Sequence, residues 1–595
     1  MTEDIREALI NPTPAPKKTK KKTKKAHKPL NPDDLKSFKY LPLERQIQIC
    51  PVKPVGISDD IFYYIDGIKQ LRAVEANKHS INIIRSLFVP YSEILPDLFP
   101  RYNKDGELTG WKGDAAADFL MSACAQKGIW DPAFEERGTG SWRDKDGGIV
   151  MHCGDVLLVR HPDGREEWLE PGEHNGFIYP GAKPAPRPAA ADKTAEDAAV
   201  RELYDLLKQW NFAVGPDLGA FLMLGWIGCA IIGGALDWRP SVWLMAKKGG
   251  GKSTLQHVIR SVLGERGIIK TSDATEAGIR QILKTSTVAV SIDEAEAEED
   301  NRKSSKMVAL ARISASGDMS LRGGEGHQAR SFVIRSPFIF SSILPPPMEG
   351  ADIDRILLLD ILKNTGAAPM IDEVRLGEIG ALLRRKMVDA WSFFRLRFSE
   401  YREGLRATGI DEARTLDQFG TLLTCAACLL YDPAAETYWD DELNGILARV
   451  RDIAVSVREE NIDETDRCLI KLLTTTTDTW RDGVKKTIGE LVDEVSRSDK
   501  AVDSDDVLQR NGIRVFRRRD DQELYFFIAN QHDALRRIFE GTKWGAKGST
   551  VGGWVRALRQ KNLPARRETV RCAKIPLRGT SFRLLDLLPE GERHA

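Results

Sequence analysis

A lysine- and glycine-rich loop between an apolar strand and a helix constrains the fold more than any other feature of the chain. Residues 241–245 (SVWLM) predict the strand, and residues 254–263 (TLQHVIRSVL) predict the helix. Glycines are needed between them because the backbone must wrap an anion more closely than side chains permit. The pattern predicts a phosphate-binding loop for ATP made of Ala246, Lys247, Lys248, Gly249, Gly250, Gly251, Lys252, Ser253 and Thr254.

Two residues of this loop carry side-chain chemistry. Lys252 is expected to reach the β- and γ-phosphates, and the Ser253 hydroxyl is expected to bind Mg²⁺. The first glycine of the usual G-x-x-x-x-G-K-[ST] pattern is Ala246 here, but three consecutive glycines follow it. The alternative interpretation, a flexible loop that binds nothing, leaves the flanking strand and helix unexplained.

A second apolar run ends in two carboxylates. Residues 287–292 (TVAVSI) predict a strand, and Asp293 and Glu294 follow it, 41 residues after Lys252. A carboxylate at a strand tip beside the loop can hold the metal, and the next acid can polarise an attacking water. We assign Asp293 to Mg²⁺ and Glu294 to the general base. An exposed acidic turn, the alternative, describes residues 296–300 better, and the short spacing predicts a compact core.

Charge is distributed unevenly, although the 595 residues include 87 basic and 87 acidic side chains. Residues 17–28 hold eight lysines, and residues 510–583 hold 18 Lys and Arg against 6 Asp and Glu. Because of these two basic regions, the neutral total charge does not exclude anionic partners. Residues 218–236 are 19 residues without a charge, which we interpret as a buried helix rather than a membrane span. A cytoplasmic location without a membrane is expected.

Composition and periodicity divide the chain into seven segments. The tail is Pro- and Lys-rich, the linker is rich in Ala and Pro, and the helical region shows apolar residues at three- and four-residue spacing. The segments are a disordered tail (1–40), an α+β domain (41–180), a linker (181–195), a P-loop domain (196–365), a helical domain (366–460), a winged-helix-like domain (461–530) and a second basic winged-helix-like segment (531–595).

The order of motifs after Asp293 resembles the helicase part of phage and plasmid primase-helicases, in the superfamily 3 branch of the AAA+ ATPases. The family has a helix, a DNA-touching β-hairpin, a polar-tipped strand and an arginine that reaches the neighbouring subunit. Residues 307–316, 320–334 and 336–342 match the first three, and Arg355 matches the arginine. The resemblance covers residues 200–365 and, more loosely, the C-terminus. It implies a multidomain chain with an α/β P-loop core of the AAA+ type, an N-terminal α+β domain, a helical region and C-terminal winged-helix-like domains.

The resemblance also implies roles for particular residues. Arg322, His327 and Arg330 would face nucleic acid, and Ser342 would sense the γ-phosphate, where the family usually has asparagine. Arg355 would act in trans as an arginine finger, because negative charge spreads over the γ-phosphate oxygens in the transition state. A surface salt bridge with a neighbouring aspartate is the alternative role for Arg355.

Arginines also cluster beside the predicted C-terminal wing. Arg517, Arg518 and Arg519 lie in the turn between two alternating runs, and phosphate contacts of this kind give affinity that does not depend on base sequence. A solvated basic face that binds nothing is the alternative.

The leading hypothesis is an ATP-dependent DNA helicase or translocase that uses ATP and Mg²⁺ in a ring, expected to be a hexamer. Single-stranded or forked DNA would be its partner. The N-terminal segment shows no primase site, which leaves priming to a separate primase. Two alternatives stay open: an AAA+-like initiator or loader that binds duplex DNA without unwinding it, and a nucleotide-gated scaffold.

Overall fold

The structure is a computed structural model of the chain. The chain divides into two compact units: unit 1 comprises Met1–Pro347 and Arg355–Ile446, and unit 2 comprises Met348–Asp354 and Leu447–Ala595. The structure describes residues 38–191, 197–247, 249–272, 275–293, 302–323, 329–343, 345, 352, 355–363, 369–435, 441–459, 464–477, 485–498, 500–545, 552–560 and 565–587.

The centre of unit 1 is a five-stranded sheet in the order β13-β14-β17-β12-β18. All of its pairings are parallel, so the carboxyl ends of the five strands meet at one edge. The central strands are almost entirely buried, as expected for a parallel sheet covered on both faces. The three strands predicted around the loop and its carboxylates are confirmed within a few residues. The strands are β12 (Ser241–Ala246), β13 (Ile268–Thr271), β14 (Ala289–Ile292), β17 (Phe338–Ser342) and β18 (Ile356–Ile361).

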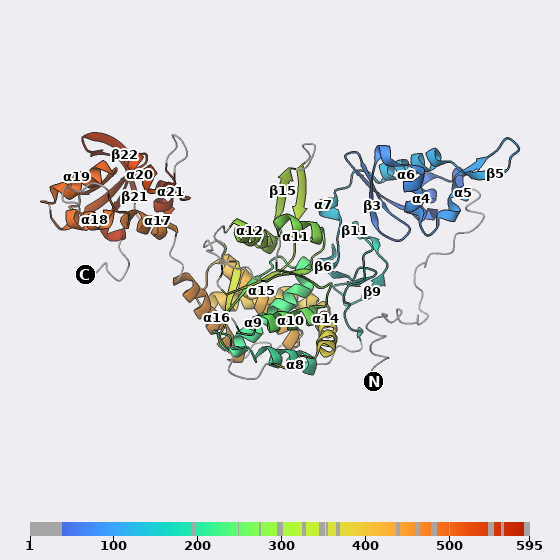
Figure 1. Cartoon of the computed structure of the whole chain (residues 1–595). Helices are drawn as coiled ribbons and strands as arrows, with labels where there is room; N and C mark the ends of the chain where they lie inside the picture. Colours follow the sequence, from blue (N-terminus) through green and yellow to red (C-terminus); the bar gives the residue numbers. More distant parts are fainter. Residues whose placement is uncertain are drawn as a thin grey trace. The chain divides into compact units, whose positions relative to one another are not determined.

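Helices surround this sheet, and a hairpin projects from it (Figure 1). Helix α9 packs against α15, and α14 packs along both α10 and α15. The hairpin consists of β15 (Met319–Gly323) and β16 (Ala329–Val333), which confirms the hairpin predicted at 320–334. The helices are α8 (Asp197–Leu207), α9 (Pro216–Ile232), α10 (Lys252–Leu263), α11 (Glu276–Leu283), α12 (Arg302–Ser316), α14 (Glu373–Ala407) and α15 (Ala413–Leu430), with α16 (Asp441–Glu459) following them.

The apolar stretch predicted as a buried helix is α9. Pro216–Ala235 is long and apolar enough to cross a membrane, but its most apolar window is 100% buried inside the protein. Its glycines allow close contact with α15: a Cβ on Gly225 would lie 2.2 Å from the Leu422 carbonyl oxygen, and a Cβ on Gly228 would lie 2.9 Å from the Cys425 Cβ. Close packing against a neighbouring helix therefore explains the Gly-rich composition.

The chain before α8 forms small antiparallel sheets. Strands β1 to β3 make one sheet, covered by α4 and α6, and β6 to β9 make another. The strands are β1 (Lys53–Ser58), β2 (Ile61–Ile65), β3 (Leu71–Glu75), β4 (Pro100–Tyr102), β5 (Leu108–Trp111), β6 (Gly140–Arg143), β7 (Ile149–His152), β8 (Leu157–Arg160), β9 (Glu166–Leu169), β10 (Gly172–His174) and β11 (Phe177–Tyr179). The helices are α3 (Leu43–Ile49), α4 (Ile81–Phe88), α5 (Leu95–Leu98), α6 (Gly113–Lys127) and α7 (Pro132–Glu135).

The β6–β9 sheet is hydrogen-bonded directly to the elements around the five-stranded parallel sheet. The Thr287 N–H, just before β14, donates to the Thr139 carbonyl at 2.8 Å. The Trp391 indole on α14 donates to the Gly147 carbonyl at 3.0 Å, and Arg385 pairs with Glu166 at 2.7 Å. The later part of the segment predicted as one N-terminal domain is thus attached to the parallel sheet through residues that lie far apart in the sequence.

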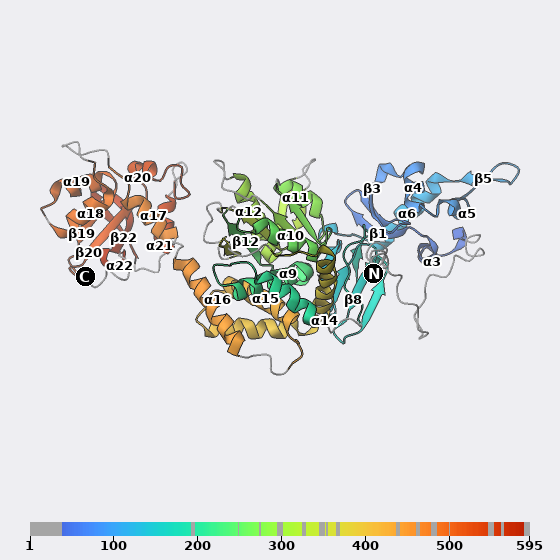
Figure 2. The same cartoon turned by 60° about the horizontal axis from the view of Figure 1, so that its bottom comes forward.

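After the last part of α16, unit 2 continues with the helices α17, α18 and α19 and then with an antiparallel sheet (Figure 2). An isolated bridge joins Thr476 to Thr487 between the first two helices. The hairpin β19–β20 follows the third of these helices and confirms the two alternating runs predicted on either side of the arginine turn. The elements are α17 (Glu464–Leu473), α18 (Ile488–Arg497), α19 (Val502–Arg510), β19 (Ile513–Arg517), β20 (Leu524–Ala529), α20 (Asp533–Ile538), α21 (Gly553–Gln560), β21 (Ala565–Cys572), β22 (Ile575–Arg583) and α22 (Leu584–Leu587).

The segments predicted as two successive winged-helix-like domains, 461–530 and 531–595, form one sheet and one core. The strand order is β19-β20-β22-β21, so β22 pairs with β20 from the preceding segment. Trp554 is fully buried, stacks on Phe539 at 5.3 Å and donates to the Ala529 carbonyl at 3.0 Å. The prediction of two separate segments is corrected because the pairing of β20 with β22 joins them.

Candidate nucleotide-binding site

The glycine-rich loop connects the end of β12 directly to the start of α10. Gly249 and Gly251 have φ angles of 85° and 83°, which side chains of L-residues rarely adopt. Gly251 caps the amino end of α10, and Lys252 and Ser253 are its first two residues. The first N–H groups of a helix have no partner within it, so this end of α10 offers donors to an anion. Lys248 lies outside the described residues.

A tryptophan that sequence reasoning missed supports the loop from behind. The Trp210 indole is buried and donates to the Gly251 carbonyl at 3.0 Å. The residues after it pair with β18: Leu362 N–H donates to the Asn211 carbonyl at 2.8 Å, and Ala213 N–H to the Asp360 carbonyl at 2.9 Å. Trp210 is therefore held by the sheet edge. Nothing local in its sequence signals this contact, because Gly251 lies 41 residues away.

Asp293 follows β14 at the same edge of the sheet, where a small polar network holds it. Its Oδ1 accepts from the Ser341 hydroxyl at 2.5 Å and from Gln256 Nε2 at 3.3 Å. Its Oδ2 lies 3.6 Å from the ammonium of Lys270, and Gln256 Nε2 also donates to the Ser341 hydroxyl at 2.5 Å. Because Gln256 is one helical turn after Lys252, this network ties the carboxylate to the loop helix.

Sequence reasoning also missed Gln256 and Lys270. Gln256 is only 3% exposed on the apolar face of α10, between Leu255 and Val258. A polar residue at a buried helix position is the signal that could have identified it, since buried amides need partners. Lys270 gave no comparable signal, because its position beside Asp293 depends on the parallel pairing of β13 with β14.

Ser342, the predicted γ-phosphate sensor, lies on the other face of β17 from Ser341. It is buried and accepts a hydrogen bond from the Trp243 indole at 2.7 Å. Trp243 in turn stacks on Phe340 at 4.6 Å. Because successive strand side chains point to opposite faces, Ser341 reaches the Asp293 network and Ser342 does not. We therefore transfer the sensor hypothesis from Ser342 to Ser341.

Arg355 lies at the opposite edge of the parallel sheet from the glycine-rich loop. It immediately precedes β18, whose first residue pairs with Ser241 and whose last residue pairs with Ala246. A strand of this length spans about 17 Å at roughly 3.3 Å per residue. The arginine predicted to act in trans is therefore separated from the loop of its own chain by the length of β18.

The other predicted residues fall outside this network. Arg322 and Arg330 are cross-strand partners in the β15–β16 hairpin. Glu294 and His327 lie outside the described residues. Arg517, Arg518 and Arg519 belong to unit 2, where they follow β19 or end it.

The oxygen donors near the loop suit a magnesium ion that completes its coordination with a nucleotide. Mg²⁺ in such sites takes one or two carboxylates, and phosphates and waters supply the rest. Asp293 would provide the carboxylate for such an ion, and Ser253, exposed at the start of α10, would provide the hydroxyl. Among the described residues, no group of three or more His, Cys, Asp or Glu is placed to hold a metal ion.

The sequence matches no protein-family model and no curated protein. Among solved structures, the chain is similar to one titled "SCCmec type IV Cch - active helicase", with a TM-score of 0.43 and 10% identity over 87% of this chain and 90% of that one. It is also similar to an apo structure of the NrS-1 C terminal region (305-718), with a TM-score of 0.29 and 11% identity over 74% and 95%. Scores this low assign neither a family nor an activity. The chain is a multidomain α/β protein whose five-stranded parallel sheet resembles a P-loop core.

Proposed function

We propose that the chain is an ATP-hydrolysing P-loop enzyme. One observation carries the proposal: the glycine-rich loop, Asp293 and Ser341 all lie at the carboxyl edge of a parallel sheet, and Gln256 joins them. Ligands of open α/β sheets bind outside the carboxyl ends of the strands. Strand β17 pairs with both β12 and β14, so its polar end supports the space between the loop and the carboxylate.

Each residue then has a chemical role. The backbone amides of the loop and the amino end of α10 bind the phosphates, and Lys252 neutralises charge on the β- and γ-phosphate oxygens. Ser253 and Asp293 would hold Mg²⁺, which when bound supplies further positive charge to the phosphates. Glu294 takes a proton from the attacking water. The water oxygen bonds to the γ-phosphorus, and the bond between the γ-phosphorus and the oxygen that bridges it to the β-phosphate breaks. Ser341 orients Asp293 through their hydrogen bond.

We further propose that hydrolysis moves DNA through a ring of subunits. The support is the order of elements after β14: helix α12, the β15–β16 hairpin, the polar-tipped strand β17 and Arg355. This order matches the superfamily 3 pattern that the sequence resembles. An arginine finger needs a neighbouring copy, because Arg355 is remote from the loop of its own chain.

Steady-state ATP hydrolysis by Lys252→Ala protein tests the enzyme proposal. We expect turnover to fall about 10²–10³-fold, as when one preorganised donor is lost from a transition state. Lys104→Ala is the matched control, since Lys104 is exposed in the β4–β5 turn and should leave turnover unchanged. Full turnover by Lys252→Ala would disprove the assignment of the loop.

Two further measurements separate the kinds of function. Stimulation of ATP hydrolysis by single-stranded DNA is expected of a translocase and not of a nucleotide-gated scaffold. Unwinding of a forked oligonucleotide is expected of a helicase and not of a loader. Native mass spectrometry with an ATP analogue tests the ring, and a strictly monomeric result would exclude Arg355 as a finger.

A further inference from the structure

Unit 2 separates its charges between two surfaces. Its second and third helices, α18 and α19, are acidic on their exposed side, and the two arginines that end them pair with aspartates of the same helix at 3.0 and 2.9 Å. A helix that enters a DNA groove in a helix-turn-helix domain must pass between two rows of phosphates. The exposed carboxylates of the helix pair therefore disfavour its entry into a DNA groove. The exposed acidic residues are Glu490, Asp493, Asp503 and Asp506.

The opposite charge gathers in a groove of the sheet. The sheet curls so far that its two edge strands meet: Arg514 on β19 donates to the Arg571 carbonyl on β21 at 2.7 Å. Between the β19–β20 turn and β21 lies a groove of about 590 Å³. The residues that line it, called here the arginine groove, are Phe516, Arg517, Arg518, Arg519, Asp520, Arg566, Arg567 and Glu568.

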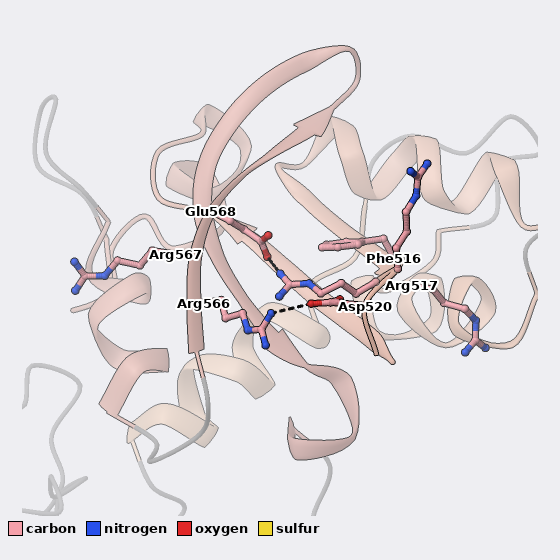
Figure 3. A pocket seen from close by; sticks show the side chains of 8 residues that line it. Phe516, Arg517, Asp520, Arg566, Arg567 and Glu568 are labelled. Carbon is pink, nitrogen blue, oxygen red and sulfur yellow. Dashed lines mark hydrogen bonds and ion pairs between the residues drawn. The ribbon is translucent and has the colours of Figure 1, made fainter. Parts of the chain in front are cut away.

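Two ion pairs across the arginine groove fix its shape. Arg518 pairs with Glu568 at 2.5 Å, and Arg566 pairs with Asp520 at 3.3 Å (Figure 3). These pairs use both carboxylates of the groove, and five arginines leave a net charge of +3. In Figure 3 the side chains of Arg517 and Arg567 lie on opposite sides of the Arg566–Asp520 pair and point away from it.

Three arginines of the groove stay available to an anion. Arg517, Arg519 and Arg567 are exposed, and no carboxylate among the described residues of unit 2 forms an ion pair with them. Guanidinium groups bind phosphates through two parallel hydrogen bonds. Three exposed guanidinium groups on different sides of the groove suit a chain of several phosphates better than a single phosphate.

Aromatic rings lie beside the arginines. Phe516 lines the groove and stacks on Tyr525 at 6.2 Å with 29° between the ring planes. The Arg518 guanidinium lies 4.4 Å from the centre of the Tyr525 ring. Proteins that bind single-stranded nucleic acid combine positive charge along the phosphate backbone with aromatic side chains on which bases stack. A duplex has no unstacked base to offer to such an aromatic face.

We propose that the arginine groove binds single-stranded DNA, with Arg517, Arg519 and Arg567 on phosphates of the strand and Phe516 against a base. The proposal rests on the DNA-dependent function proposed above. It assigns the DNA contact of unit 2 to the sheet and not to the helix pair.

Fluorescence anisotropy of labelled oligothymidylate, titrated with the full chain without nucleotide, tests the proposal. For Arg517→Ala/Arg519→Ala/Arg567→Ala, we expect affinity to fall roughly tenfold and the logarithmic salt slope to become shallower by about 2, since each contact with a single strand contributes about 0.7. The matched control is Arg497→Ala/Arg510→Ala on the helix pair, which should bind as the unchanged chain does. Loss of binding in the control alone would overturn the proposal, as would tighter binding of duplex than of oligothymidylate.

A second pair of variants tests whether the binding of oligothymidylate can be strengthened. Asp520→Asn releases Arg566 from its ion pair and should strengthen binding of oligothymidylate severalfold. Asp503→Asn makes the same charge change on α19 and should have no effect. Equal effects of the two variants would show that only net charge matters and would overturn the groove. Because no ATP is present, these results are independent of whether Lys252→Ala abolishes hydrolysis.

Discussion

The proposed nucleotide site of unit 1 and the arginine groove of unit 2 use charged side chains in different environments. Asp293 is held by a serine, a glutamine and a lysine at the end of buried strands, so its geometry is set by the sheet. The arginines available in the groove are exposed and attached to a turn and an edge strand. The first arrangement suits chemistry, which needs fixed distances, and the second suits a flexible polyanion, whose binding depends on salt.

The largest expected effect is a loss of ATP turnover that leaves DNA binding by unit 2 unchanged. Asp293→Asn keeps the shape of the side chain but removes its charge, so ATP turnover should fall about 10²–10³-fold. Binding of oligothymidylate without nucleotide should stay unchanged, since the groove belongs to unit 2. Asp105→Asn, in the exposed β4–β5 turn, is the control for turnover. If Asp293→Asn weakens ATP turnover and oligothymidylate binding equally, the two regions do not act separately.

The next effect concerns the two faces of β17. Ser341→Ala removes a hydrogen bond to a carboxylate and should slow turnover about tenfold, whereas Ser342→Ala should leave turnover nearly unchanged. Ser342→Ala should instead lower the free energy of unfolding by about 1–3 kcal/mol, because it leaves the buried Trp243 indole without its acceptor. Kinetics and chemical denaturation of both variants check this. The reverse pattern would restore Ser342 as the sensor.

A third test uses two glycines with similar backbone conformations. Gly251 and Gly541 have φ angles of 83° and 75°, so alanine at either should cost about 1 kcal/mol of stability. A Cβ on Gly251 would lie 3.0 Å from the Trp210 indole nitrogen, whereas one on Gly541 would meet nothing within 4 Å. Slower ATP hydrolysis is therefore expected for Gly251→Ala only. Equal ATP turnover in both variants would contradict the hypothesis that Trp210 supports the glycine-rich loop.

The smallest effect is a pH dependence of stability in each unit. Burial lowers the pKa of His152 in unit 1 and of His532 in unit 2 below the ordinary value of 6.5. Below pH 6.5 the unfolded chain binds protons that the native imidazoles do not, so stability is present above this pH and is lost as the pH falls. Hydrogen exchange of each unit between pH 7 and 5 measures this loss.

Single replacements assign the loss to each unit. His152→Asn should flatten the pH dependence in unit 1 alone, and His532→Asn in unit 2 alone. A pH dependence that survives both replacements would show that other groups control acid stability.

Sequence patterns predicted the elements of the nucleotide site well because each pattern is local. An apolar run before a glycine-rich loop predicted β12 and α10, and an apolar run before two acids predicted β14. The contacts among these elements were less accessible. Gln256 and Ser341 lie 85 residues apart, and no periodicity connects an amide on a helix to a hydroxyl at a strand tip. The choice between Ser341 and Ser342 depended on which face of β17 each residue occupies.

The arginine groove shows the same division more strongly. The excess of basic residues in 510–583 was visible from composition. The pairing of β20 with β22 was not visible from composition, because helices α20 and α21 and strand β21 separate the two strands along the chain. Without that pairing, Arg518 and Glu568 would not be close enough to form an ion pair. The sequence alone therefore could not show that the sheet, and not the acidic helices, offers the surface for DNA.

The sequence alone determined which residue types are available for phosphate chemistry, since loop glycines, Lys252 and Asp293 are recognisable from their neighbours along the chain. Tertiary structure decided which of them act together. Parallel pairing brings the ends of separate strands to one edge, and curling of an antiparallel sheet brings its two edges into contact. Both depend on burial of side chains from distant segments in a shared core, which cannot be read from any single stretch of sequence.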